Sequence, residues 1–184
     1  MTIAFRPGLI ASFAKLARDV RAISAVEFAI VLPLMITLFL GGNEVSQAIS
    51  IKRKTVLVNR TVADLVAQDS TITTTEMNSI FAASSAVVAP FNASNLKIIV
   101  SQVIVDGNGI AKVDWSRAYQ TTARAQNSPV TLPTGLNIPN TYLIWAETSY
   151  SYTPPIGYTI TGMLTMLDQM YLRPRLTASV TCCS

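Results

Sequence analysis

Histidine is missing from this chain of 184 residues, and charged residues make up only 13% of it. Without histidine, the sequence lacks the commonest general base and a frequent metal ligand. It also contains no glycine-rich phosphate loop and no cluster of ligand-type residues. A hydrolase triad is therefore excluded, and we expect a protein that is not an enzyme and binds neither a cofactor nor a metal.

Cysteine is also scarce, and the two cysteines, Cys182 and Cys183, are adjacent. Adjacent thiols lack the two-residue gap of a metal knuckle, and a disulfide between neighbours departs from the usual disulfide geometry. The pair therefore favours a passive tail, with pairing to another chain as the alternative.

Apolar residues are abundant, at 50% of the chain, and their longest run is residues 22–42, AISAVEFAIVLPLMITLFLGG. A helix rises about 1.5 Å per residue, so roughly 20 residues cross the ~30 Å hydrocarbon core of a bilayer. The run predicts a transmembrane helix over residues 23–42. Its only charge is Glu27, and a lone carboxylate in lipid is costly, so Glu27 requires a function. Pro33 lies inside the run and predicts a kink, because it removes a backbone donor.

The charges predict how the chain sits in the membrane. Residues 1–22 carry a net charge of +3, residues 23–68 carry +1, and the charges from residue 69 onward cancel. Positive residues favour the cytoplasmic side, so we expect a cytoplasmic leader over 1–22 and an exported domain over 69–184. This predicts a single-pass membrane protein, and the family resemblance described below implies that its membrane is the bacterial inner membrane. A neutral main domain gives no support for nucleic-acid binding.

The helix is expected to continue past the membrane over residues 43–68, because neither proline nor glycine interrupts residues 44–68. Lys52 and Asn59 break its apolar stripe, which predicts that this extension packs on the domain over only part of its length. The stripe consists of Val45, Ala48, Ile49, Val56, Val62 and Val66. The basic run 52–54 is interpreted as a solvated face near lipid headgroups.

The exported domain is predicted to be α+β and pilin-like, with the long helix packed on a small antiparallel sheet. Thr73-x-x-Glu76 is a capping box that begins a second helix, which Pro90 ends. Residues 96–105 form an expected strand that is apolar on both faces, and residues 106–109 form a turn. In the returning strand, alternation places Ala111, Val113 and Trp115 on one face.

Residues 119–140 are polar and proline-containing, and they predict a long loop that carries function. A third strand is expected over 142–152, where Trp145, Tyr150 and Tyr152 would pack in the core, as would Trp115. A further strand is expected around 158–167, and an edge strand over 171–180, because Pro174 suits an edge.

The stretch from Arg21, RAISAVEFAIVLPL, resembles the amino-terminal signature of the TadE-like pseudopilins of the tight-adherence (Tad, or Flp) pilus. In that family a basic leader meets a small residue, then a short spacer, Glu-Phe or Glu-Tyr, and an apolar helix containing Leu-Pro. The later stretches QVIVDGNGIAKVDWSRA, YLIWAETSYSYTPPIGYTITG and DQMYLRPRL are similar to segments of TadE-related domains.

The resemblance implies a minor pseudopilin that supports pilus assembly and surface adhesion. A prepilin peptidase would cut after Ala22, where the family usually has glycine, so that Ile23 begins the mature chain. Glu27, with Phe28 beside it, would then set the register between subunits by neutralising a neighbour's terminal amine. The implied partners are the major pilin, other minor pilins, the prepilin peptidase, the inner-membrane platform proteins and membrane lipid.

Three alternatives remain open from the residues. In the first, Glu27 lies only about a turn inside the membrane and reaches headgroups or water. In the second, the apolar run is a signal sequence cut after the triplet 46–48 (Ser-Gln-Ala), which would release a secreted binding protein. In the third, the chain is a permanently anchored subunit of an envelope complex. Pro33 is open too, since it either only bends the helix or weakens it so that a subunit can leave the bilayer.

Overall fold

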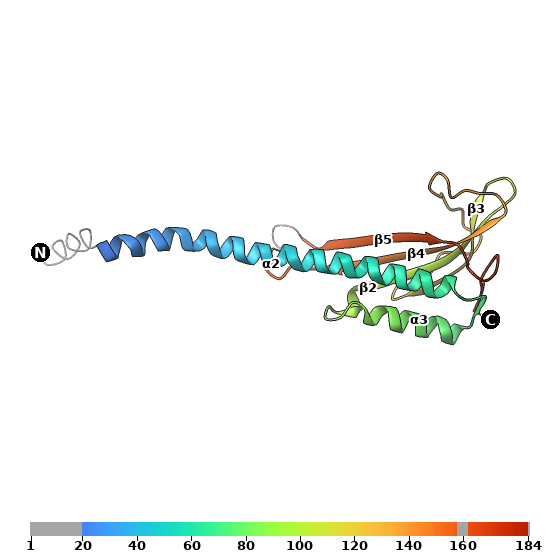
Figure 1. Cartoon of the computed structure of the whole chain (residues 1–184), viewed down its shortest axis with the longest axis horizontal. Coiled ribbons are helices and arrows are strands. Elements are labelled where there is room, and N and C mark those ends of the chain that lie inside the picture. Colours follow the sequence, from blue (N-terminus) through green and yellow to red (C-terminus); the bar gives the residue numbers. More distant parts are fainter. Residues whose placement is uncertain (1–19, 158–161, 184) are drawn as a thin grey trace, which may run out of the picture. The chain divides into compact units, whose positions relative to one another are not determined.

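A computed structural model describes residues 20–157 and 162–183, and its longest element is helix α2 (Val20–Ala67; Figure 1). The chain divides into two compact units, residues 1–45 and 46–184, so the second part of the predicted helix extension is grouped with the domain. The expected leader lies almost wholly outside the described residues.

The second unit is built around the inner face of α2. The buried residues of this face recur at steps of three and four, as a helix packed on a sheet requires; they are Ile51, Thr55, Val58, Val62 and Val66. The stripe predicted from the sequence was therefore partly wrong. Ile49 and Val56 are 49% and 37% exposed, because they lie on the opposite side of the helix.

Asn59 is fully buried in this face, and its polar side chain has partners on the sheet. Its Nδ2 donates to Asp168 Oδ2 at 2.9 Å, and its Oδ1 accepts from the hydroxyl of Thr148 at 3.0 Å. Lys52, the other polar break in the stripe, also reaches Asp168, at 3.5 Å. The sequence predicts Lys52 and Asn59 to be places where the helix stops packing on the domain. In the structure both residues instead make polar contacts with the sheet.

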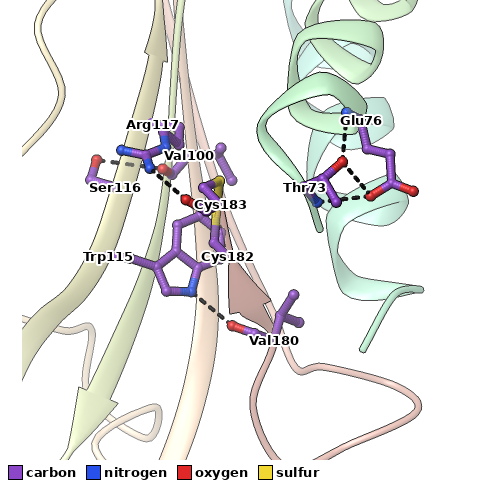
Figure 2. Close-up of a disulfide and its surroundings, with 9 residues drawn as sticks. All are labelled: Thr73, Glu76, Val100, Trp115, Ser116, Arg117, Val180, Cys182 and Cys183. Atoms are coloured by element: carbon purple, nitrogen blue, oxygen red, sulfur yellow. Dashed lines mark hydrogen bonds between the residues drawn. A yellow bond between two sulfur atoms is a disulfide. The ribbon is translucent and has the colours of Figure 1, made fainter. Parts of the chain in front are cut away.

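Helix α3 (Thr74–Ala86) begins at the predicted capping box. Thr73 Oγ1 accepts from the backbone N–H of Glu76 at 3.2 Å, and the Glu76 carboxylate accepts from the backbone N–H and hydroxyl of Thr73 (Figure 2). The hydrogen bond from the backbone N–H of Thr73 lowers the pKa of Glu76 most, and the bond from the Thr73 hydroxyl lowers it further. The helix buries Met77 and Phe81 in the core that it shares with α2 and the sheet.

The main sheet has four antiparallel strands in the order β3-β2-β4-β5. This confirms the α+β fold with a small antiparallel sheet that the sequence predicted. Strands β2 (Leu96–Val105) and β4 (Thr141–Tyr152) lie in the centre, and β3 (Ala111–Tyr119) and β5 (Leu164–Leu172) lie at the edges. One face packs against α2 and α3. The edge strand is β5, at residues 164–172, and not the segment 171–180 that the sequence predicted. β5 overlaps the end of the strand expected around 158–167, and the start of that segment lies outside the described residues.

A β-bulge in β3 overturns the predicted alternation of that strand. Gln102 pairs with Trp115, but the next residue of β2, Val103, pairs with Val113, so that Asp114 is the extra residue. Trp115 is thereby moved to the main core beside the helices, while Ala111 stays on the opposite face. Asp114 accepts a hydrogen bond from the Gln102 side chain at 2.6 Å.

The loop 120–140 covers half of the sheet's other face, which explains why β2 is apolar on both sides. It runs beside β3, where the N–H of Val113 donates to Ser128 and that of Val130 donates to Ala111, each at 3.0 Å. Val130 and Leu132 pack on a second buried cluster, formed by Val103, Val105, Ala111 and Trp145.

The carboxyl-terminal segment is docked on the domain, so the expectation of a passive tail was wrong. β6 (Thr181–Cys182) pairs in parallel with β1 (Thr71–Ile72), and Cys182 and Cys183 are joined in a disulfide. Trp115 Nε1 donates to the carbonyl of Val180 at 2.8 Å, and Val180 is fully buried (Figure 2). Main-chain bonds and the core therefore hold this segment in place.

The polar contacts of Asn59 give a first prediction. Asn59→Ala leaves the buried Thr148 hydroxyl without its partner and removes one of the contacts of Asp168, which keeps Lys52. We expect the free energy of unfolding to fall by about 1–3 kcal/mol. The measurement is chemical unfolding of the full chain in detergent, followed by near-ultraviolet circular dichroism. Asn78→Ala, at an exposed position of α3, is the matched control and should change stability by less than about 0.5 kcal/mol. Equal losses in the two variants would contradict the assignment.

Candidate functional site

The first part of α2 exposes apolar side chains on every side. From Ile23 to Phe39 its large apolar residues are between 37% and 75% exposed, and within the described residues α2 is the one helix long and apolar enough to cross a membrane. They include Ile23, Val26, Phe28, Ile30, Leu32, Leu34, Leu38 and Phe39. A helix that is apolar all round needs either a protein core or lipid around it, and this segment has no protein cover. This is consistent with a single-pass membrane anchor.

The residues singled out from the sequence lie along this exposed segment. Ile23 and Phe28 are 50% and 60% exposed, and Glu27 is exposed among the apolar side chains. Glu27 forms neither a hydrogen bond nor an ion pair with any residue that the structure describes.

Pro33 lies inside α2, and the helix continues on both sides of it. The hydroxyl of Thr37 donates to the carbonyl of Pro33 at 2.8 Å, which is a local bond from a side chain to the preceding turn. The functional effect of Pro33 stays a prediction, as does cleavage between Ala22 and Ile23.

The three cations of the basic run 52–54, interpreted from the sequence as a solvated face, differ in their contacts. Lys52 contacts Asp168 and the carbonyl of Leu167, and Lys54 Nζ donates to the carbonyl of Val87 at 3.1 Å. Arg53 lies between them and is exposed on the outer side of the helix. The fold therefore leaves one cation of the three directed away from the domain.

The sheet face turned away from the helices carries a polar cluster that the sequence did not predict. Arg124, in the loop, forms two hydrogen bonds with the Glu147 carboxylate, at 2.6 and 2.7 Å, and lies 4.0 Å above the centre of the Trp145 ring. Trp145 in turn stacks on Tyr171 at 5.6 Å. These residues come from three distant segments, so no local spacing could have indicated the cluster.

The electrostatics of this cluster follow from partial burial and from the ion pair. The hydrogen bond to Glu147 raises the pKa of Arg124, while desolvation opposes it. Desolvation, and then the charge of Glu147, raise the pKa of Tyr171. Both groups therefore stay protonated near neutral pH, and the cluster is a fixed anchor for the loop.

Next to this anchor the same sheet face is open, in a cleft of about 530 Å³. It is lined on three strands by Lys97, Ile99, Glu147, Ser149, Leu167 and Gln169. The described residues contain no group of three or more histidine, cysteine or acidic side chains that could hold a metal ion.

Membrane insertion of α2 gives the second prediction. An aspartate near the centre of a transmembrane helix costs about 3 kcal/mol on insertion scales. We therefore expect the double variant Leu34→Asp, Leu38→Asp to leave the membrane fraction on alkaline carbonate washing, where the unmodified chain stays. Leu57→Asp changes a residue that is 52% exposed in the second unit, and it should leave membrane retention unchanged. Retention of the double variant would count against α2 as the anchor.

Comparison with known proteins agrees with the sequence signature. Residues 22–70 match a family model described as TadE-like protein. Neither the curated proteins nor the solved structures gave a match. The matched segment contains Glu27, Phe28 and Pro33 and extends to the end of α2, so it includes both the exposed apolar part and the part that packs on the sheet. Residues 22–70 are thus similar to the TadE-like family, and this similarity covers the whole described length of the helix from Ile23 onward.

Proposed function

We propose that this chain is a membrane-anchored minor pseudopilin that supports assembly of a Tad-type pilus used in surface adhesion, and that it has no enzymatic activity. One observation carries the proposal: the TadE-like match coincides with an exposed apolar helix whose first half contains a single carboxylate, Glu27. The family links the chain to the Tad pilus system in general, and the role as an assembly subunit is our inference.

In this proposal the leader is cytoplasmic and the second unit lies outside the inner membrane. Support comes from the net charge of +3 over residues 1–22 and from the balanced charge of the domain. A single-pass helix with this orientation places the domain in the periplasm, and outside the cell once the subunit is in a pilus. The exposed loop and the open sheet face would then contact other pilins.

Glu27 is proposed to fix the axial register between subunits. Cleavage after Ala22 would create an α-ammonium on Ile23, four residues before the carboxylate. Among parallel helices, a neighbour's carboxylate can neutralise that amine, and their attraction is strong where water is excluded. The partners implied by this step are the prepilin peptidase, the major pilin and other minor pilins, and the inner-membrane platform.

Pro33 is proposed to assist transfer from lipid to fibre. It removes one backbone hydrogen bond from the helix, which reduces the cost of bending there. The weakened segment would allow the anchor to adapt when the subunit leaves the bilayer.

The third prediction concerns the mature amino terminus. Amino-terminal sequencing of the protein purified from pilus-forming cells should give Ile23 as the first residue. A start at Ile49 would instead identify a secreted protein, because the cut would follow Ala48. A start at Met1 would identify a permanently anchored protein. Ala22→Gly is the matched variant and should be processed at least as completely as the natural sequence.

The fourth prediction tests the register role directly. Glu27→Ala should reduce surface pili at least tenfold, because the apolar helix loses its only charge for pairing. The measurement is the amount of pilus sheared from cells, with the level of the variant in membranes as the control. Val26→Ala alters the neighbouring apolar position and should leave piliation near normal. Normal piliation by Glu27→Ala at a normal membrane level would exclude the register role.

A further inference from the structure

We propose that the outer side of α2 in the second unit binds the apolar amino-terminal helix of a second copy of this chain, in parallel, with Glu27 of one copy against Arg53 of the other. We call this surface the outer stripe, and it consists of Ile49, Arg53, Val56 and Arg60. The inference rests on the proposed pilus function and names a surface that subunit association would use.

The outer stripe is an unpartnered helix face within the described part of the chain. Ile49 is 49% exposed, Val56 is 37% exposed, and both arginines are exposed. The four positions are separated by steps of four, three and four residues, so they lie on one side of the helix. The opposite side is the buried face that contains Ile51 and Val58. One face of α2 thus holds the domain together while the other is open to a partner.

The charge on this stripe is available for a partner. Lys52 and Lys54 contact Asp168 and Val87, but within the described residues neither Arg53 nor Arg60 has an ion-pair partner. A guanidinium binds a carboxylate through two parallel hydrogen bonds and is more weakly hydrated than an ammonium. An occupant with one acid in an apolar surface would therefore suit the outer stripe.

The first part of α2 carries that complementary pattern. Its residues Ile23, Glu27, Ile30 and Leu34 follow the same steps of four, three and four. Apolar residues at this spacing are what parallel helices use to pack against each other. Ile23, Ile30 and Leu34 are between 50% and 73% exposed, and Glu27 has no partner among the described residues. The apolar helix thus presents one acid where the outer stripe presents a base.

Aligning the pattern of the first segment with that of the outer stripe gives the axial shift between the two copies. Each residue of the first segment meets the residue 26 positions later in its neighbour, an axial shift of about 39 Å. The pairs are Ile23 with Ile49, Glu27 with Arg53, Ile30 with Val56, and Leu34 with Arg60. The last pair is compatible because the aliphatic stem of an arginine packs on apolar side chains.

This contact is compatible with the amine contact proposed for Glu27. A carboxylate has two oxygens, and a helix inside a fibre has more than one neighbour, so one copy can provide the amine and another can provide Arg53. The guanidinium contact does not require cleavage after Ala22. The two contacts can therefore be tested separately.

The first test is chemical cross-linking in pilus-forming cells. Two differently tagged full-length copies carry Ile30→Cys and Val56→Cys, and a short bismaleimide joins them; the native disulfide does not react with maleimide. Ser50→Cys replaces Val56→Cys in the matched control, because Ser50 is exposed but lies off the outer stripe. We expect at least tenfold more mixed dimer with Val56→Cys. Equal yields, or a product with a different polypeptide in place of the second copy, would overturn the proposal.

The second test is a charge exchange. Arg53→Glu and Glu27→Arg should each reduce the Ile30–Val56 product at least tenfold, and the two together in every copy should restore it. Arg173→Glu makes the same substitution at an exposed site that follows β5 and lies outside the cleft, and it should have no effect. Arg53→Glu lies outside the apolar run, so it tests the contact even if Glu27→Arg impairs insertion. Failure of the double variant to restore the product, when it is inserted normally, overturns the ion pair.

The two proposals fail in different ways. If Glu27→Ala abolishes pili while Ile30→Cys and Val56→Cys give no product, pilus function stands and the outer-stripe contact is wrong. If piliation is normal in Glu27→Ala and the product is also absent, the register role of Glu27 and the outer-stripe contact are both wrong. Normal piliation in cells that lack the whole chain would refute the pilus function itself.

Discussion

The structure depends on one constraint: helix α2 must place its first part in apolar surroundings outside the domain and one face of its second part in the domain core. Over residues 23–39, α2 is exposed and apolar on all sides, which only lipid or other apolar helices can cover. From Ile51 onward, one face of the same helix is buried against the sheet and α3. The same helix therefore contributes an apolar surface to the outside of the protein in its first part and part of the domain core in its second part.

Two polar residues hold α2 to the sheet, the buried Asn59 and the partly exposed Lys52. Asn59 and Lys52 both reach Asp168 on β5, and Asn59 also reaches Thr148 on β4. Buried polar groups are tolerated only when they are hydrogen-bonded, and such contacts have strict geometry. They therefore fix which residues of α2 lie over which strands, a choice that apolar packing alone leaves less defined.

The loop 120–140 lies on the sheet face that is turned away from the helices. The loop 120–140 closes half of the sheet's outer face, where Arg124 holds it to Glu147 and Trp145. The other half stays open as a cleft. A fixed loop beside an open sheet face is a surface on which small sequence changes can alter partner choice without changing the core. This suits a protein proposed to act through contacts between subunits.

The sequence by itself determined the elements whose signals are local. The apolar run, the long helix, the capping box at Thr73 and the strand 96–105 could all be predicted, because periodicity and capping act within a few residues. The TadE-like signature around Glu27 is local too. Only the tertiary structure decided which side of α2 is buried, the bulge at Asp114 and the docking of the segment that ends in Cys183. These features arise from contacts between distant segments, such as Asn59 with Asp168 and Trp115 with Val180, and no pattern of neighbouring residues contains that information.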